Sequence, residues 1–179
     1  QRIPIRIEKV SSGRYMSTLP FRSDMRPRDN YWVNLTRLDK WQARLERKGL
    51  HQEVEDNLFK LLNEGQAEII NETDGYFIPL QEVVREDSPS TPVRVVGNAS
   101  FGKISLNDVL DKMEVSGLDV LPHLLRSRNK KFLLLSDMKK AFLQILIAPE
   151  HRKYLRFVWR TKDQKLIHLQ MTALPFGLV

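Results

Sequence analysis

An aspartate that follows a short apolar run is the strongest candidate for chemistry in this sequence. Residues 132–135 read Phe-Leu-Leu-Leu, and Asp137 comes two positions later. A continuous apolar run of this length predicts a central strand covered on both faces, with the carboxylate at its end. Because Mg²⁺ prefers carboxylate oxygens and completes its shell with phosphates and water, Asp137 could be a metal ligand of a nucleotide site. The same side chain could instead cap the turn after the strand.

The composition limits the other kinds of chemistry. The 179 residues are 41% hydrophobic, enough for one packed domain or two small subdomains. Cysteine is absent, which excludes disulfides and thiolate metal sites. Neither a membrane-spanning run nor a secretory signal is readable, so the cytosol or nucleus is the expected location. The net charge of +7 suits a polyanionic partner such as nucleic acid, although a solvated basic surface would explain it as well.

The first part of the chain predicts an irregular segment followed by two amphipathic helices. Residues 1–28 carry three prolines and no sustained period. From Asn30, which with Asp29 is placed to cap a first turn, apolar residues follow the helical period. A second helix over residues 50–62 ends before Gly65, a left-handed cap. The stripe expected in the core from the first helix is Trp32, Leu35, Leu38, Trp41 and Leu45.

The rest of the chain predicts short strands with few helices. Residues 66–71 and 76–86 flank a Glu-Thr-Asp-Gly turn and predict a hairpin, followed by a break at residues 88–90. Ser105 is placed to begin a short helix, and residues 118–128 predict another. Further strands are expected at 91–99, 143–148, 154–159 and 165–170, the last two joined around Lys162 and Asp163. This order indicates an α+β fold rather than a doubly wound sheet.

Three segments of the chain resemble motifs of a known family, and they follow one another in the order that the family has. Residues 135–145, Leu-Ser-Asp-Met-Lys-Lys-Ala-Phe-Leu-Gln-Ile, resemble motif A of retroelement reverse transcriptases. Residues 91–100, Thr-Pro-Val-Arg-Val-Val-Gly-Asn-Ala-Ser, followed by Ser-Leu-Asn-Asp at 105–108, resemble the fingers signature of BEL/Pao-type LTR retrotransposons. Leu-Pro-Phe-Gly-Leu at 174–178 resembles the motif B loop. Each match alone is weak, whereas their order and spacing are much more specific.

The resemblance implies the fingers and partial palm of a right-hand polymerase. Residues 1–28 would be an irregular N-terminal segment, 29–130 a fingers-like subdomain and 131–179 the N-terminal part of the palm. The parent protein would be an RNA-directed DNA polymerase within a retrotransposon polyprotein, located in the cytoplasm, the nucleus or a virus-like particle. Its partners would be an RNA or DNA template with a primer, deoxynucleoside triphosphates and the remainder of the polyprotein, with no membrane.

The resemblance also implies a role for three side chains. Asp137 would be the first catalytic carboxylate and would help to hold two Mg²⁺ ions. Phe142 would be a steric gate that fills the space of a ribose 2′-hydroxyl; the alternative is that its ring is simply part of the core. Arg94 would bind the incoming triphosphate through a charge-assisted contact.

The remaining implied contacts come largely from the backbone. Amides around Met138, Lys140 and Ala141 would cradle the same phosphates. Phe176 and Gly177 would approach the nascent base pair, where a glycine permits close contact.

The chain departs from the family pattern at several positions. Gly97-Asn98 stands where the family usually has Phe-Asp, and Leu80-Gln81 where it usually has two histidines. The second carboxylate cluster, a Tyr-x-Asp-Asp hairpin, is missing, and no Asp-Asp pair occurs in the sequence. A two-metal site needs both clusters, so we expect this chain alone to be catalytically inactive.

Two other interpretations remain open. The chain could be a decayed or domesticated module that keeps the fold and binds nucleic acid or protein without catalysis. It could also be an unrelated basic α+β domain in which the three ordered motifs are coincidental.

Overall fold

The chain folds as a mixed α+β structure, as the sequence predicts. A computed structural model describes residues 5–22, 24–84, 93–112 and 120–178. Its helices are Tyr31–Lys48 (α1), His51–Asn63 (α2), Leu106–Val109 (α3), Val120–Ser127 (α4) and Pro149–Arg152 (α5), with a 3₁₀ turn over Ala141–Gln144. Its strands are Ile7–Lys9 (β1), Tyr15–Ser17 (β2), Ala67–Ile70 (β3), Leu80–Val84 (β4), Val93–Gly97 (β5), Leu146–Ile147 (β6), Arg156–Arg160 (β7) and Leu166–Met171 (β8). None of the helices in these ranges is long and apolar enough to span a membrane.

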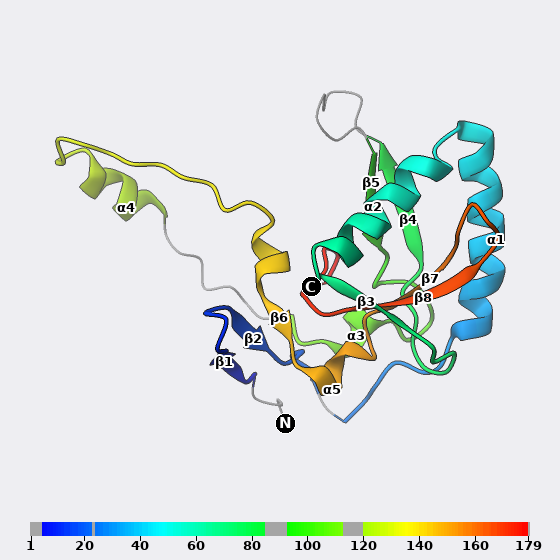
Figure 1. Ribbon diagram of the computed structural model, residues 1–179. Helices are drawn as coiled ribbons and strands as arrows, with labels where there is room; N and C mark the ends of the chain where they lie inside the picture. The colour runs from blue at the N-terminus through cyan, green and yellow to red at the C-terminus, as the bar shows by residue number, and fades with distance from the viewer. Residues whose placement is uncertain (1–4, 23, 85–92, 113–119, 179) are drawn as a thin grey trace.

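The strands of the described residues form three small sheets around one hydrophobic core. β8 lies between β3 and β7 and is antiparallel to both. β4 pairs with β5, and β2 lies between β1 and β6. α1 packs against β7, and α2 contacts β3 and β5 (Figure 1). Because β3 precedes residue 130 and β8 follows it, the predicted fingers and palm parts share one sheet.

Both long helices are confirmed, together with their glycine ends. Gly49 and Gly65 have φ values of 67° and 66°, in the left-handed region that glycine adopts without steric cost. Ser105 likewise begins α3, where its side chain and that of Asp108 each bond to the other's backbone N–H. These ends depend only on neighbouring residues, which explains why the sequence predicts them well.

The buried face of α1 differs from the predicted stripe at one position. Trp32 is 72% exposed, whereas Tyr31 beside it is buried. Tyr31 packs against Phe77 with ring centroids 5.2 Å apart. Its hydroxyl also lies 3.0 Å from Nε2 of His168 on β8. The tyrosine therefore gives the buried His168 ring a hydrogen-bond partner, which the hydroxyl-free side chain of a tryptophan at position 31 would not supply in the same way.

The predicted hairpin over residues 66–86 is wrong, although both of its strands exist. β3 pairs with β8, and β4 pairs with β5. The turn between them is instead fastened to the start of α1. Asp29 Oδ2 accepts from the Gly75 N–H at 2.6 Å, and the Asn30 side chain bonds to both backbone groups of Phe77. Residue alternation thus indicates a strand but not its partner.

The expectation of an irregular N-terminal segment is also wrong in part. β1 and β2 form an antiparallel pair, and β2 runs parallel to β6. β6 is shorter than the predicted strand over 143–148, because the 3₁₀ turn occupies the first part of it. β5 and the β7–β8 hairpin match their predictions, while the break at 88–90 lies outside the described residues.

The strand predicted at residues 132–135 is wrong. Residues 132–138 have no regular secondary structure, and Leu134 is 96% exposed. The preceding helix α4 buries none of its residues. We call residues 120–139 the arm; Figure 1 shows α4 lying apart from the sheets at the end of this extended segment. An apolar run becomes a central strand only where two neighbouring strands are available, and the described residues supply none.

Candidate functional site

Asp137 does not lie where the sequence places it. Its side chain is exposed on the arm, and among the described residues it makes no ion pair. Nor do the described residues contain a group of three acidic or histidine side chains that could hold a metal ion. A single exposed carboxylate is too few ligands to retain Mg²⁺, so the described residues do not by themselves fit the expected metal.

Two other predicted site residues do lie together. The rings of Phe142 and Phe176 meet edge to face with centroids 5.6 Å apart, an arrangement that aromatic quadrupoles favour. They are separated by 34 positions in the sequence. Phe142 is 52% exposed and Phe176 is 47% exposed. The exposure of Phe142 contradicts the alternative that its ring is simply part of the core.

The Phe142 and Phe176 rings border an apolar cavity of about 520 Å³. The cavity lies between the N-terminal strands and the last described residues of the chain, and none of the described residues that line it is charged. It can therefore receive an apolar or planar group but offers no charged side chain to a triphosphate. Neither Arg94 nor Asp137 contributes to this lining.

Gly177 connects the segment that resembles motif B to the segment that resembles the fingers signature. Its φ is 98°, and a Cβ there would lie 2.5 Å from the carbonyl oxygen of Gly97. No side chain fits at such a distance, so the close approach requires glycine. The Asn107 side chain donates to the Gly177 carbonyl at 3.1 Å and to Ser100 Oγ at 2.8 Å. Asn107 is buried, and it joins two of the segments that carry the resemblance, residues 91–108 and 174–178.

The Gly97-Asn98 departure has a local structural reason. A Cβ on Gly97 would lie 3.1 Å from the Phe157 ring and 3.0 Å from Ile78. Phe157 on β7 therefore occupies space that a side chain at position 97 would need. Asn98 Oδ1 accepts from the Ser100 N–H at 3.2 Å and stabilises the turn after β5.

The residues expected to cradle phosphates lie at the base of the arm. Met138 is 66% exposed and Ala141 is exposed. Lys140 has a φ of 55° and forms an ion pair with Glu64, just past α2. The hydrogen bond from Lys140 lowers the pKa of the Glu64 carboxyl. Lys140 therefore anchors the end of the arm to the rest of the fold and is not free for a phosphate.

Arg94 lies on the exposed face of β5, opposite Val83 of β4. It makes no ion pair with the described residues. The structure thus joins Phe142, Phe176 and Gly177 but does not bring Asp137 or Arg94 to them.

A second concave region was missed by the sequence analysis. It lies between α1 and β4 and carries four cations of α1: Arg37, Lys40, Arg44 and Arg47. Their spacing of three, four and three residues was the available signal, because it places them on one side of a helix.

Comparison with known proteins adds no family. No protein-family model matches the chain, and no curated protein sequence matches it significantly.

Proposed function

We propose that this chain forms the fingers and the beginning of the palm of a reverse transcriptase of the BEL/Pao retrotransposon type. The observation that carries the proposal is the meeting of the resembling segments. Asn107 bonds to Gly177, Gly177 packs on Gly97, and Phe176 packs on Phe142. These residues belong to three separate motifs, and a chance set of short matches would have no reason to converge.

The activity belongs to a longer protein that includes a second carboxylate cluster. There Asp137 would contribute one ligand to Mg²⁺, and Arg94 would bind the triphosphate of the incoming deoxynucleotide. The half-exposed Phe142 and Phe176 rings would border its sugar and base. Because Asp137 lies on the exposed arm, this arrangement requires the arm to pack as a strand against the rest of the palm.

The second candidate is a module that binds nucleic acid or protein without catalysis. It is favoured by the exposed Asp137, by the Lys140–Glu64 ion pair and by the local turn that Asn98 stabilises. The two candidates predict different gene sequences downstream of the codon for residue 179. An open frame that encodes Tyr-x-Asp-Asp supports the polymerase, and a stop codon supports the module.

Primer extension by the longer protein tests the polymerase directly. We expect Asp137→Ala to abolish deoxynucleotide incorporation, because a metal ligand is lost. Asp163→Ala is the matched control, since Asp163 is an exposed aspartate in the turn between β7 and β8. Equal activity of the two variants would refute the role of Asp137.

Ribonucleotide incorporation tests the proposed gate in the same assay. Phe142→Val should relax discrimination against ribonucleotides because the smaller side chain leaves room for a 2′-hydroxyl. Phe59→Val on α2 is the control. If discrimination is unchanged in the Phe142 variant, its ring is not the gate.

A further inference from the structure

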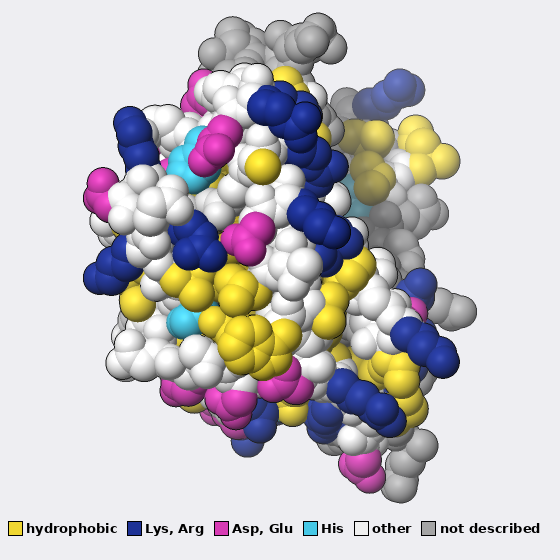
Figure 2. Space-filling model, turned by 90° about the vertical axis from the view of Figure 1, so that its right-hand side faces the viewer, with side chains coloured by type: hydrophobic (Ala, Val, Ile, Leu, Met, Phe, Trp, Pro, Cys, Tyr) yellow, Lys and Arg dark blue, Asp and Glu magenta, His cyan; other side chains and the backbone are white. Residues whose placement is uncertain are grey.

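The four α1 cations form one continuous stripe. Arg37, Lys40, Arg44 and Arg47 lie within eleven residues of α1, and the ten helical steps from the first to the last cover about 15 Å. Figure 2, which faces the side of the molecule where α1 lies, shows Lys and Arg side chains in a row. We call these four residues the basic stripe.

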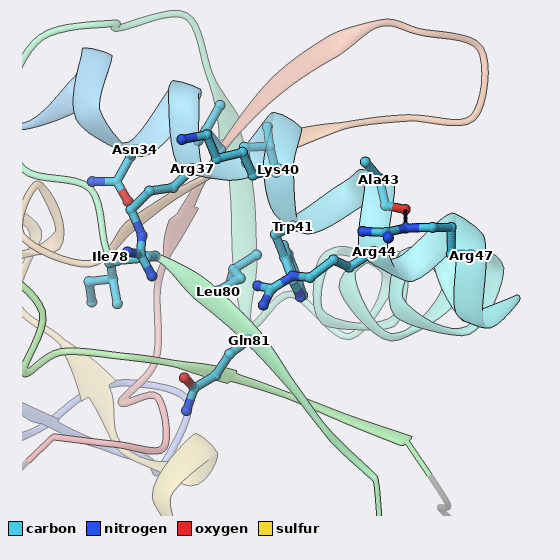
Figure 3. A pocket seen from close by; sticks show the side chains of 13 residues that line it. Asn34, Arg37, Lys40, Trp41, Ala43, Arg44, Arg47, Ile78, Leu80 and Gln81 are labelled. Atoms are coloured by element: carbon cyan, nitrogen blue, oxygen red, sulfur yellow. Dashed lines mark hydrogen bonds between the residues drawn. The ribbon is translucent and has the colours of Figure 1, made fainter.

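The basic stripe borders a groove with an apolar floor. The groove has a volume of about 590 Å³ and lies between α1 and the start of β4. Trp41, Pro79 and Leu80 supply apolar lining, and Gln81 and Asn34 supply amides. Figure 3 shows Arg37 and Arg44 reaching from α1 toward the side where Ile78, Leu80 and Gln81 lie. No acidic residue of the described chain lines the groove.

The positive charge of the stripe is not neutralised by the described residues. Neighbouring cations do find acids: Lys48 pairs with Glu82 at 2.8 Å and Arg160 pairs with Asp39 at 3.1 Å. Within the described ranges, none of the four stripe residues forms such a pair. Glu82 and Asp39 are thus paired with cations outside the stripe, and the four stripe cations line the groove.

Two of the stripe residues are held in place by uncharged partners. The Arg37 guanidinium lies 3.9 Å from the centroid of the Phe101 ring, and Arg47 Nε donates to the Ala43 carbonyl at 3.2 Å. Such contacts orient a guanidinium without cancelling its charge. The side chains are therefore partly ordered before any ligand arrives.

We infer that the groove binds the sugar–phosphate backbone of a single-stranded nucleic acid. A stacked strand carries one phosphate per about 3.4 Å, so the stripe matches about four phosphates. A positively charged groove that follows the backbone is also a general feature of sites for single strands. The inference does not depend on polymerase activity, because it uses neither Asp137 nor the Phe142–Phe176 pair.

Fluorescence anisotropy of the full chain with a labelled oligodeoxythymidylate and a labelled oligouridylate tests the inference. We compare Arg37→Gln/Lys40→Gln/Arg44→Gln/Arg47→Gln with a control that removes the same charge elsewhere, Lys103→Gln/Lys112→Gln/Lys162→Gln/Lys165→Gln, at exposed positions. The stripe variant should bind at least about tenfold more weakly than the control. Its salt dependence should also fall, because about 0.7 counterions per lost phosphate contact are no longer released, a decrease of about 3 in slope. Equal affinities and slopes for the two variants would overturn the inference.

Two further measurements keep the test decisive. Lys40→Gln/Arg44→Gln/Arg47→Gln retains the Arg37–Phe101 contact, so a loss of slope by about 2 in this variant cannot come from disturbing that contact. Poly-glutamate is then added as a competitor at equal charge. The nucleic-acid assignment predicts weak displacement, whereas displacement as strong as by unlabelled oligonucleotide would show a general polyanion site and would refute the assignment.

Discussion

Many large apolar residues are buried in the body of the molecule, whereas those of its arm are exposed. We call the described residues outside the arm the body. In the body, four of the five residues of β7 are buried in succession, and Trp159, Leu155 and Leu169 are fully buried. In the arm, the uninterrupted run at residues 132–135 is exposed throughout. This run is entirely apolar, yet no strand of the described residues pairs with it.

The difference shows that burial depends on the neighbours of a segment and not on its hydrophobicity. β8 is covered by β3 on one edge and β7 on the other, and Tyr31 of α1 packs against its His168 ring. Free energy from apolar burial is gained only when water is actually displaced. The arm would gain it only by packing against another surface, as the proposed palm requires.

We expect the largest difference between the two regions in the free energy of unfolding when one large apolar residue of each is truncated to alanine. Trp159→Ala should lower the free energy of unfolding by about 3–5 kcal/mol, because a fully buried indole leaves a cavity. It also loses contacts with Trp41 and His51 at centroid distances of 5.7 and 4.8 Å. Leu134→Ala in the arm should change it by less than about 0.5 kcal/mol. Denaturant unfolding of this chain measures both, and a large loss for Leu134→Ala would show that the arm is packed in solution.

The elements that depend on local signals could be predicted from the sequence. The period of α1, the glycines that end α1 and α2, and Ser105 before α3 all act on adjacent residues. The choice of Tyr31 over Trp32 for the core could not be predicted, because it depends on His168 far along the chain. For the same reason the partners of β3 and β4 were not foreseen.

The candidate site was predictable to a similar extent. The resemblance brought Phe142, Phe176 and Gly177 into one group, and they do lie together. The apolar run at residues 132–135 placed Asp137 at the end of a buried strand, which requires neighbouring strands that the described residues lack. The basic stripe was missed because the charge was considered only as a total, although its spacing along α1 was visible in the sequence.

We expect a smaller difference in the free energy of unfolding when a buried carboxylate of the body and an exposed carboxylate of the arm are each removed. Glu55 Oε2 accepts from Trp159 Nε1 at 2.9 Å and from the Lys162 N–H at 3.0 Å. Glu55→Ala leaves both donors without this acceptor and should cost about 1–3 kcal/mol of unfolding free energy. Glu55→Gln keeps one acceptor oxygen and should cost less. Asp137→Ala on the arm is the matched control, and a loss equal to that of Glu55→Ala would contradict the exposed position of Asp137.

We expect the smallest difference when one histidine of the body and one histidine of the arm are replaced and the free energy of unfolding is followed as the pH is lowered. Burial, and to a lesser extent Arg156 nearby, lowers the pKa of His168 on β8 below its usual 6.5. The unfolded chain therefore takes up its proton first, and the free energy of unfolding falls as the pH drops from about 6.5 toward that lowered value, with no such loss above about 6.5. In His168→Gln the decrease between pH 7 and 5 should be smaller than in the unmodified chain. His123→Gln on α4 should leave the decrease unchanged, because His123 is exposed on the arm. Denaturant unfolding at a series of pH values compares the two, and an equal decrease in all three proteins would contradict the lowered pKa of His168.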